Sequence, residues 1–105
     1  MLLNKVGYSR KRVRYLSEGY RSLRHMKDTK PGRPLSLLVE LVDLDIAQQY
    51  LTDDEYVTWL MCGICGYTTR EAAEFLGVSH MTVSRRYDRA IEVLKSVMNN
   101  DDQAM

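Results

Sequence analysis

One short pattern of small and polar residues constrains the fold of this chain more than any other feature. Ala73 is followed four residues later by Gly77, and Ser79 comes two residues after that glycine. A small side chain lets two helices cross closely, glycine adopts a positive φ in a turn at little cost, and serine is a preferred N-cap. The pattern therefore predicts one helix that ends before the glycine and a second that begins at the serine, which together form a helix-turn-helix over residues 69–88.

The two helices, expected over 69–76 and 79–98, have distinct faces. Val78 is expected to fill the core from the turn, and apolar residues of the second helix recur at helical spacing and are expected to face inward: Val83, Tyr87, Ala90, Ile91 and Leu94. The outward face then carries His80, Met81, Ser84, Arg85 and Asp88, with Arg86 and Arg89 at its edges. The first residues of such a recognition helix enter the major groove of DNA, while the preceding helix lies across the backbone. The pattern thus predicts double-stranded DNA as the partner.

Three stretches of the C-terminal half resemble the fourth conserved region of the primary sigma-factor family. They are LTDDEY at 51–56, GYTTREAAEFLGVS at 66–79 and TVSRRYDRAI at 82–91. The resemblance covers 51–97 and extends to small phage and bacterial regulators that share this unit. It implies a four-helix unit that reads the −35 promoter element and docks on the flap of RNA polymerase. No counterpart of the family's promoter-melting region is found, so a complete sigma factor is not expected.

The resemblance also implies a set of DNA contacts, carried over by position: Arg70, Ser79, His80, Thr82, Ser84 and Arg85. Arg85 is the best candidate for a guanine or phosphate contact. Together with the outward face, the candidate DNA-binding residues are Arg70, Ser79, His80, Met81, Thr82, Ser84, Arg85, Arg86 and Arg89.

Charge is distributed unevenly along the chain, although the net charge is only +1. Residues 1–34 carry +8, residues 35–66 carry −6 and residues 67–105 carry −1. A dense basic run in the first segment predicts an auxiliary nucleic-acid contact by Arg10, Lys11, Arg12 and Arg14. Such a contact would compensate for a recognition helix that is weakly basic and contains Asp88. The alternatives are a solvated basic face and RNA binding, since tyrosines at 8, 15 and 20 are interleaved with the bases.

The remaining patterns indicate an all-α protein with two parts. A basic amphipathic helix over 9–27 and a linker with two prolines and a glycine make residues 1–34 an N-terminal arm. Residues 35–105 form a helical domain that contains the helix-turn-helix at 69–88. Its first helix, over 35–50, is so apolar that either the C-terminal unit or a second copy of the chain must cover it, and the second case makes a homodimer. Its next helix begins at the N-cap Thr52 with Glu55 as capping-box partner, and its expected core face is Val57, Leu60, Met61 and Ile64.

Several classes of function are not expected. Cys62 and Cys65 form a lone C-x-x-C, and zinc would need two further ligands where only His25 and His80 exist, so buried, reduced thiols are predicted. There is no phosphate-binding glycine loop and no catalytic constellation, so we expect no enzyme, no cofactor and no metal. No apolar run approaches the ~18 residues of a membrane span, and the N-terminus has no signal-peptide pattern. The expected place is the cytoplasm of a bacterium or of a phage-infected host.

The function predicted from these observations is a sequence-specific double-stranded DNA-binding transcriptional regulator. A first alternative is a sigma-like module that binds RNA polymerase, which the acidic segment 35–66 favours. A second is a phage DNA-packaging subunit similar to a small terminase, in which helix-turn-helix units grip viral DNA in a ring. The mass in solution separates this last alternative, because a ring of many chains favours packaging and a monomer or dimer favours regulation.

Overall fold

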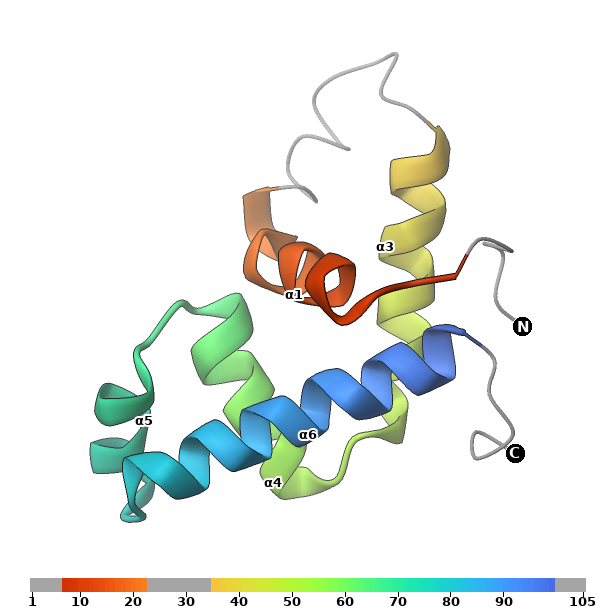
Figure 1. The fold of residues 1–105 in the computed structure, drawn as a ribbon. Helices are drawn as coiled ribbons and strands as arrows, with labels where there is room; N and C mark the ends of the chain where they lie inside the picture. The colour runs from red at the N-terminus through yellow and green to blue at the C-terminus, as the bar shows by residue number, and fades with distance from the viewer. Residues whose placement is uncertain (1–6, 23–34, 100–105) are drawn as a thin grey trace.

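The computed structural model describes residues 7–22 and 35–99, with side chains from residue 39 onward in the second stretch, and it confirms an all-α protein (Figure 1). No strand occurs in these two stretches. The elements are α1 (Arg10–Glu18), α3 (Leu35–Ala47), the 3-10 helix η1 (Gln48–Tyr50), α4 (Asp53–Thr58), the π-helix η2 (Trp59–Ile64), α5 (Thr69–Leu76) and α6 (His80–Met98).

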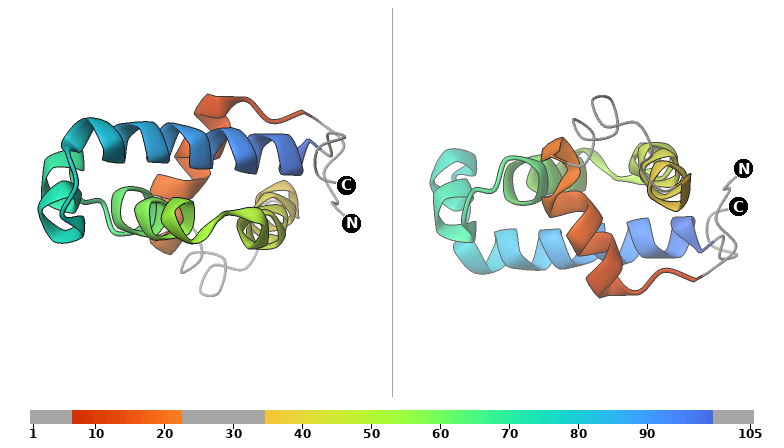
Figure 2. Two further views of the ribbon diagram at one scale, coloured as in Figure 1. Left: turned by 90° about the horizontal axis from the view of Figure 1, so that it is seen from below. Right: turned by 90° about the horizontal axis from the view of Figure 1, so that it is seen from above.

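The long helix α6 runs along the molecule, and the other helices pack around it (Figure 2). Helix α5 lies at the N-terminal end of α6, α3 lies near its C-terminal end, and α1 crosses it in between (Figures 1 and 2). All the α6 side chains that were predicted to face inward are buried: Val83, Tyr87, Ala90, Ile91 and Leu94. The helical spacing of apolar residues therefore identified the core face of α6 correctly.

Helix α1 is part of the main hydrophobic core. Its side chains Val13 and Leu16 are fully buried, in one cluster with residues of α3 and α6. The helix predicted over 9–27 is interrupted at Gly19, which caps the C-terminus of α1 with an N–H that donates to the carbonyl of Tyr15 at 3.0 Å. Residues 20–22 are helical again, and the rest of that predicted helix and the predicted linker lie outside the described residues. The division of the chain at residue 34 stays a prediction, although the apolar face of α1 shares its core with the C-terminal part.

The apolar segment 35–50 is helical as predicted, and its last three residues form the 3-10 helix η1. Leu41, Leu44 and Ala47 are fully buried in the cluster that also holds α6 side chains. Part of the apolar surface of α3 is therefore covered within a single chain. A homodimer through this helix stays a prediction, and Val42, 38% exposed, is the apolar α3 side chain left at the surface of the described residues.

Helix α4 begins with the predicted capping box, in which Thr52 and Glu55 each bond to the backbone N–H of the other. Its predicted core face is wrong at Val57, which is 39% exposed. Thr58 and Trp59 face inward instead, and the Trp59 indole N–H donates to the Ser17 hydroxyl on α1 at 2.9 Å. Burying Trp59, the first residue of η2, outweighs the apolar spacing that had suggested the other face. The π-helix that follows adds a further change of register.

Candidate nucleic-acid interface

The turn between α5 and α6 has the predicted geometry. Gly77 has φ +70°, a conformation that costs glycine little, and its N–H donates to the carbonyl of Ala73 at 2.9 Å. Ser79 is the N-cap of α6, and its hydroxyl accepts from the N–H of Thr82 at 3.1 Å. Helix α5 itself begins with a capping box between Thr68 and Glu71. Both helices of the motif are thus fixed by side chains at their first turns.

Small side chains let α5 and α6 approach each other closely. Ala72 and Ala73 of α5 are buried against Val83 of α6, and Val78 packs against them from the turn. This second, smaller cluster holds the motif together, and it includes the half-buried Met61 of η2. The outer face of α6 is therefore presented on a packed scaffold rather than on a free loop.

The predicted outward face is exposed along the first two turns of α6. His80, Ser84 and Arg85 are exposed, and Met81 is 68% exposed. Met81, Ser84 and Arg85 line a shallow pocket together with Asp88. Arg85 makes no ion pair with any described residue. The structure thus brings a thioether, a hydroxyl, a guanidinium and a carboxylate together on one surface.

The other candidate DNA contacts differ in whether their side chains already form hydrogen bonds or ion pairs within the protein. Arg70 is exposed near the start of α5. The hydroxyls of Ser79 and Thr82 lie 2.9 Å apart and bond to each other, so both are already partly used in capping α6. Arg86 is half-buried, with its Nη2 3.8 Å from Asp54 of α4, which draws its charge toward that helix.

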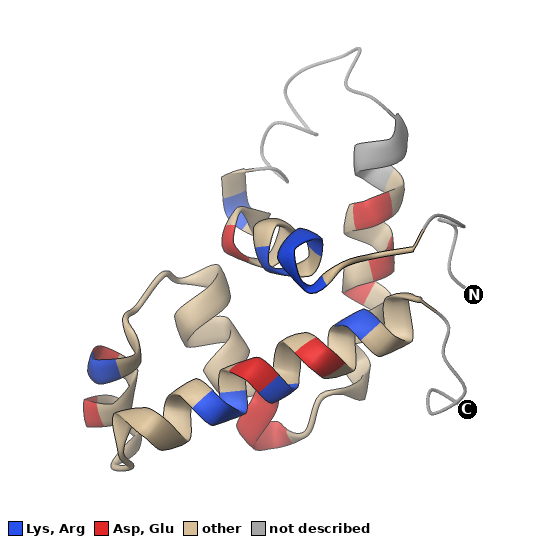
Figure 3. Ribbon diagram, in the orientation of Figure 1, with Lys and Arg blue, Asp and Glu red and all other residues tan. Residues whose placement is uncertain are grey.

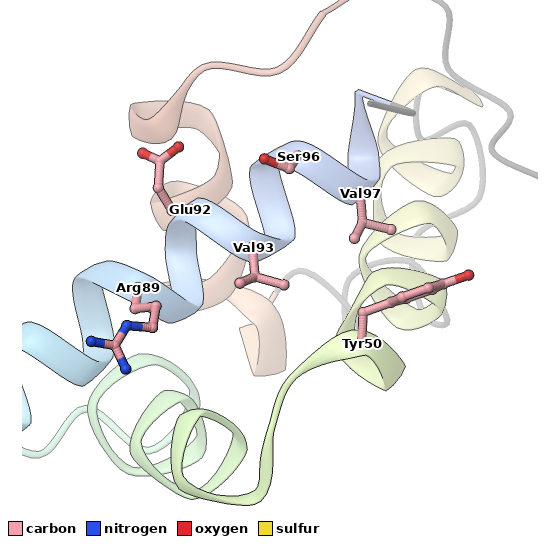
Figure 4. Close-up of a pocket in the computed structure, with 6 residues that line it drawn as sticks. All are labelled: Tyr50, Arg89, Glu92, Val93, Ser96 and Val97. Atoms are coloured by element: carbon pink, nitrogen blue, oxygen red, sulfur yellow. The ribbon is translucent and has the colours of Figure 1, made fainter. Parts of the chain in front are cut away.

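Arg89 lies at one end of a groove between η1 and α6 (Figure 4). Tyr50, Val93 and Val97 give this groove an apolar lining, and Arg89 is exposed beside it without an ion-pair partner among the described residues. At the edge of the outward face, Arg89 is therefore available to bind a phosphate, whereas Arg86 is paired with Asp54.

Acidic and basic residues alternate along α6, and basic residues of α1 lie beside them (Figure 3). Arg10, the first residue of α1, contacts both acidic side chains of α6. Its Nε is 3.2 Å from an oxygen of Glu92 and its Nη2 is 3.7 Å from an oxygen of Asp88. Arg10, one of the four residues predicted as auxiliary contacts, therefore lies next to α6.

The other basic residues of α1 have different surroundings. Arg12 donates to both oxygens of Glu40 on α3, at 3.0 and 2.5 Å, and these hydrogen bonds raise the pKa of the Arg12 guanidinium above its usual value. Arg14 donates to Glu18 at 3.3 Å. Lys11 is exposed and has no ion-pair partner in the described part of the chain. Of the four auxiliary residues, Lys11 is the one that is free to meet a phosphate without giving up an internal partner.

The prediction that the two cysteines are buried is wrong. Both are free thiols, but Cys62 is only half-buried and Cys65 is exposed, because the π-helix ends at Ile64 and Cys65 already caps it. Burial raises the pKa of the Cys62 thiol. No group of three His, Cys, Asp or Glu side chains in residues 7–22 and 35–99 is arranged to hold a metal ion. Within the same residues, no helix combines the length and the apolar character needed to cross a membrane.

Comparison with known families agrees with this geometry. The family model described as Sigma-70, region 4 matches residues 56–96. The match confirms that the C-terminal half carries a helix-turn-helix domain similar to sigma region 4, and it supports DNA binding as the general role of the chain. No curated protein and no solved structure matches the chain. Helices α1 and α3 lie outside the matched residues.

Sequence reasoning missed one feature of this surface, the contact between Arg10 and the two acids of α6. Asp88 and Glu92 are four residues apart, which places them on one side of a helix. Two carboxylates on the outward face of a DNA-binding helix indicate that a basic residue from another segment lies close to them. Which basic residue this is depends on where α1 crosses α6, and the sequence carries no pattern for that crossing.

Proposed function

We propose that this protein is a sequence-specific double-stranded DNA-binding transcriptional regulator of a bacterium or phage, acting in the cytoplasm. In this proposal the N-terminal turns of α6 enter the major groove, and α5 lies across the DNA backbone. The observation that carries the proposal is the exposed surface of His80, Met81, Ser84 and Arg85, presented by a packed helix-turn-helix that matches sigma region 4.

The proposed contacts fall into two classes. Arg85, Ser84, Met81 and His80 are proposed to read base edges, because they are exposed and lie on the first two turns of α6. Side chains at helix starts and edges are proposed to hold phosphates: Arg70, Ser79, Thr82 and Arg89. Arg86 belongs to the original set, but its ion pair with Asp54 makes it a weaker proposal. Lys11 is the proposed auxiliary phosphate contact from α1.

The test compares two arginines of the same helix. A preferred site is first selected from random duplexes, and affinity for that site and for a scrambled duplex is then measured by fluorescence anisotropy. Arg85→Ala should weaken the preferred site by about 5- to 150-fold, as expected when a bidentate base contact of about 1–3 kcal/mol is lost. It should weaken the scrambled duplex far less. Arg89→Ala, the matched control, should weaken binding to the preferred site and to the scrambled duplex by the same factor. If Arg85→Ala also weakens the two duplexes equally, Arg85 contacts phosphate and does not read a base.

A second candidate function, contact with RNA polymerase, is favoured by the outer face of α4. Tyr56 and Val57 are 38% and 39% exposed, and they follow the acidic first turn of α4, in which Asp53 and Asp54 are exposed. Exposed apolar side chains beside charged ones are typical of protein interfaces. Binding of purified bacterial core polymerase should weaken in a Tyr56→Ser, Val57→Ser double variant and stay unchanged in Arg85→Ala. If neither the wild type nor Arg85→Ala binds the polymerase, this second candidate is excluded.

A further inference from the structure

Two carboxylates interrupt the surface of α6 that is proposed to face DNA. The side chains of Asp88 and Glu92 are 60% and 47% exposed, and they follow Arg85 on the outward side of the helix. A phosphate that approaches this part of α6 meets two negative charges, and like charges near a polyanion oppose binding. A DNA-binding surface with this composition needs a counter-charge.

Arg10 is in position to supply that counter-charge to both acids at once. Its guanidinium is 3.2 Å from Glu92 and 3.7 Å from Asp88, and it is itself half-exposed. Lys95 also approaches Glu92, at 3.8 Å, whereas Asp88 has no other ion-pair partner among the described residues. Removing Arg10 would therefore leave the charge of Asp88 uncompensated on the surface.

The position of Arg10 is fixed by its neighbours rather than by the ion pairs alone. Tyr8 is 4% exposed, and its backbone is held at the C-cap of α6 by two hydrogen bonds with Asn99, of 2.6 and 3.0 Å. Ser9 then caps α1 by accepting from the N–H of Arg12 at 3.0 Å. Arg10 thus begins a helix whose start is attached to α6 itself, so its charge stays beside the recognition helix without the entropic cost of ordering a free arm.

We propose that Arg10 is the intramolecular counterion of the recognition helix: it offsets the negative charge of Asp88 and, together with Lys95, that of Glu92, and so allows DNA phosphates to approach the middle of α6. This inference rests on the proposed DNA-binding function. It assigns Arg10 a positioning role different from the direct phosphate contact expected from the sequence. It also explains how a recognition helix with an outward aspartate and glutamate is compatible with a polyanionic partner.

The test is a cycle that separates a counterion from a direct contact. Affinity for a duplex is measured by fluorescence anisotropy in about 100 mM salt for the wild type and for Arg10→Ala. The same substitution is then measured in a background that carries Asp88→Asn and Glu92→Gln, which keep shape and remove charge. Arg10→Ala should weaken binding by about three- to tenfold in the wild type, the size expected for partly screened charges. In the neutral background it should weaken binding by a clearly smaller factor, because Arg10 then contributes only its own positive charge and no longer offsets a repulsion between the two acids and DNA.

Lys11→Ala is the matched control, since Lys11 is the next residue of α1 and has no ion-pair partner in the described residues. As a direct phosphate contact it should weaken binding by the same factor in both backgrounds. If Arg10→Ala behaves like Lys11→Ala, Arg10 contacts phosphate directly and the counterion role is refuted. If Arg10→Ala has no effect in either background, that role is refuted as well. A wild type that binds no duplex refutes the proposed function itself, and the first titration already shows that outcome. Exposed ion pairs contribute little to folding, so thermal unfolding of Arg10→Ala should match the wild type.

Discussion

Truncation of one α1 side chain should destabilise the whole described fold, because α1 is built into its core. Leu16 is fully buried and lies in one cluster with side chains of α3 and α6. Leu16→Ala removes that packing and leaves a cavity, which typically costs about 2–5 kcal/mol. With a loss of about 3 kcal/mol, the melting temperature of a domain of this size should fall by about 12–24 °C. Most domains have a total stability of about 5–15 kcal/mol, so the variant should still fold at low temperature.

The chain provides its own reporter for this experiment. Trp59 is its single tryptophan, is 2% exposed, and donates to Ser17, the neighbour of Leu16 in α1. Urea unfolding is followed by tryptophan fluorescence and by far-ultraviolet circular dichroism, with the exposed Lys11→Ala as the control. Both signals should report one transition, shifted in Leu16→Ala and unshifted in the control. A change below about 0.5 kcal/mol, within the range of ordinary surface substitutions, would refute this reasoning and make residues 1–34 a separate arm.

Three further predictions follow from single side chains. Thr58 is fully buried, and its hydroxyl has no hydrogen-bond partner among the described residues, so Thr58→Val should raise the free energy of unfolding by about 1 kcal/mol in urea titrations. Burial, together with a hydrogen bond to the Glu18 carboxylate, raises the pKa of the Tyr87 hydroxyl. Above about pH 10 the unfolded state loses this proton while the folded state keeps it, so the free energy of unfolding should fall above that pH. The fall should be smaller in Tyr87→Phe, which has no such proton. Iodoacetamide should modify Cys65 before Cys62, whose burial raises its thiol pKa; mass spectrometry of Cys65→Ser should show only slow modification, and equal rates would contradict the placement of these thiols.

The helix-turn-helix was predictable because its determinants are local. A glycine at positive φ, a serine cap and apolar residues at helical spacing act within a few residues of one another, and the structure has all three at Gly77, Ser79 and along α6. The same holds for the capping box at Thr52. Such signals depend on backbone geometry that one segment imposes on itself, so a single sequence is sufficient to reveal them.

The features that escaped prediction depend on contacts between distant segments. The core face predicted for the helix after Thr52 is wrong at Val57, because Trp59 finds a buried partner 42 residues away, at Ser17. The basic run of α1 was interpreted as a free binding surface because the carboxylates that engage Arg10 and Arg12 lie on α6 and α3. Gly19 was the exception, since a glycine inside an apolar pattern signals a helix end locally. Charge composition therefore overstated how much of α1 is available to a partner.

The availability of α1 can be measured directly by comparing Arg12 with Lys11. Arg12 is joined to Glu40 by two hydrogen bonds, and the Glu40 side chain is only 11% exposed, so Arg12→Ala leaves a nearly buried carboxylate without its partner. A hydrogen bond to a charged group contributes about 1.5–3 kcal/mol, so this variant should lose stability of that order. Since Arg12 is not expected to meet phosphate, the dependence of log affinity on log salt should stay unchanged. Lys11→Ala should show the opposite result, with stability unchanged and a salt slope shallower by about 0.9, the value for one phosphate contact on duplex DNA. The opposite outcome would be a shallower salt slope for Arg12→Ala with unchanged stability. It would mean that the ion pair between Arg12 and Glu40 opens when DNA binds, so that more of the +8 charge of residues 1–34 acts on DNA than the ion pairs of α1 suggest.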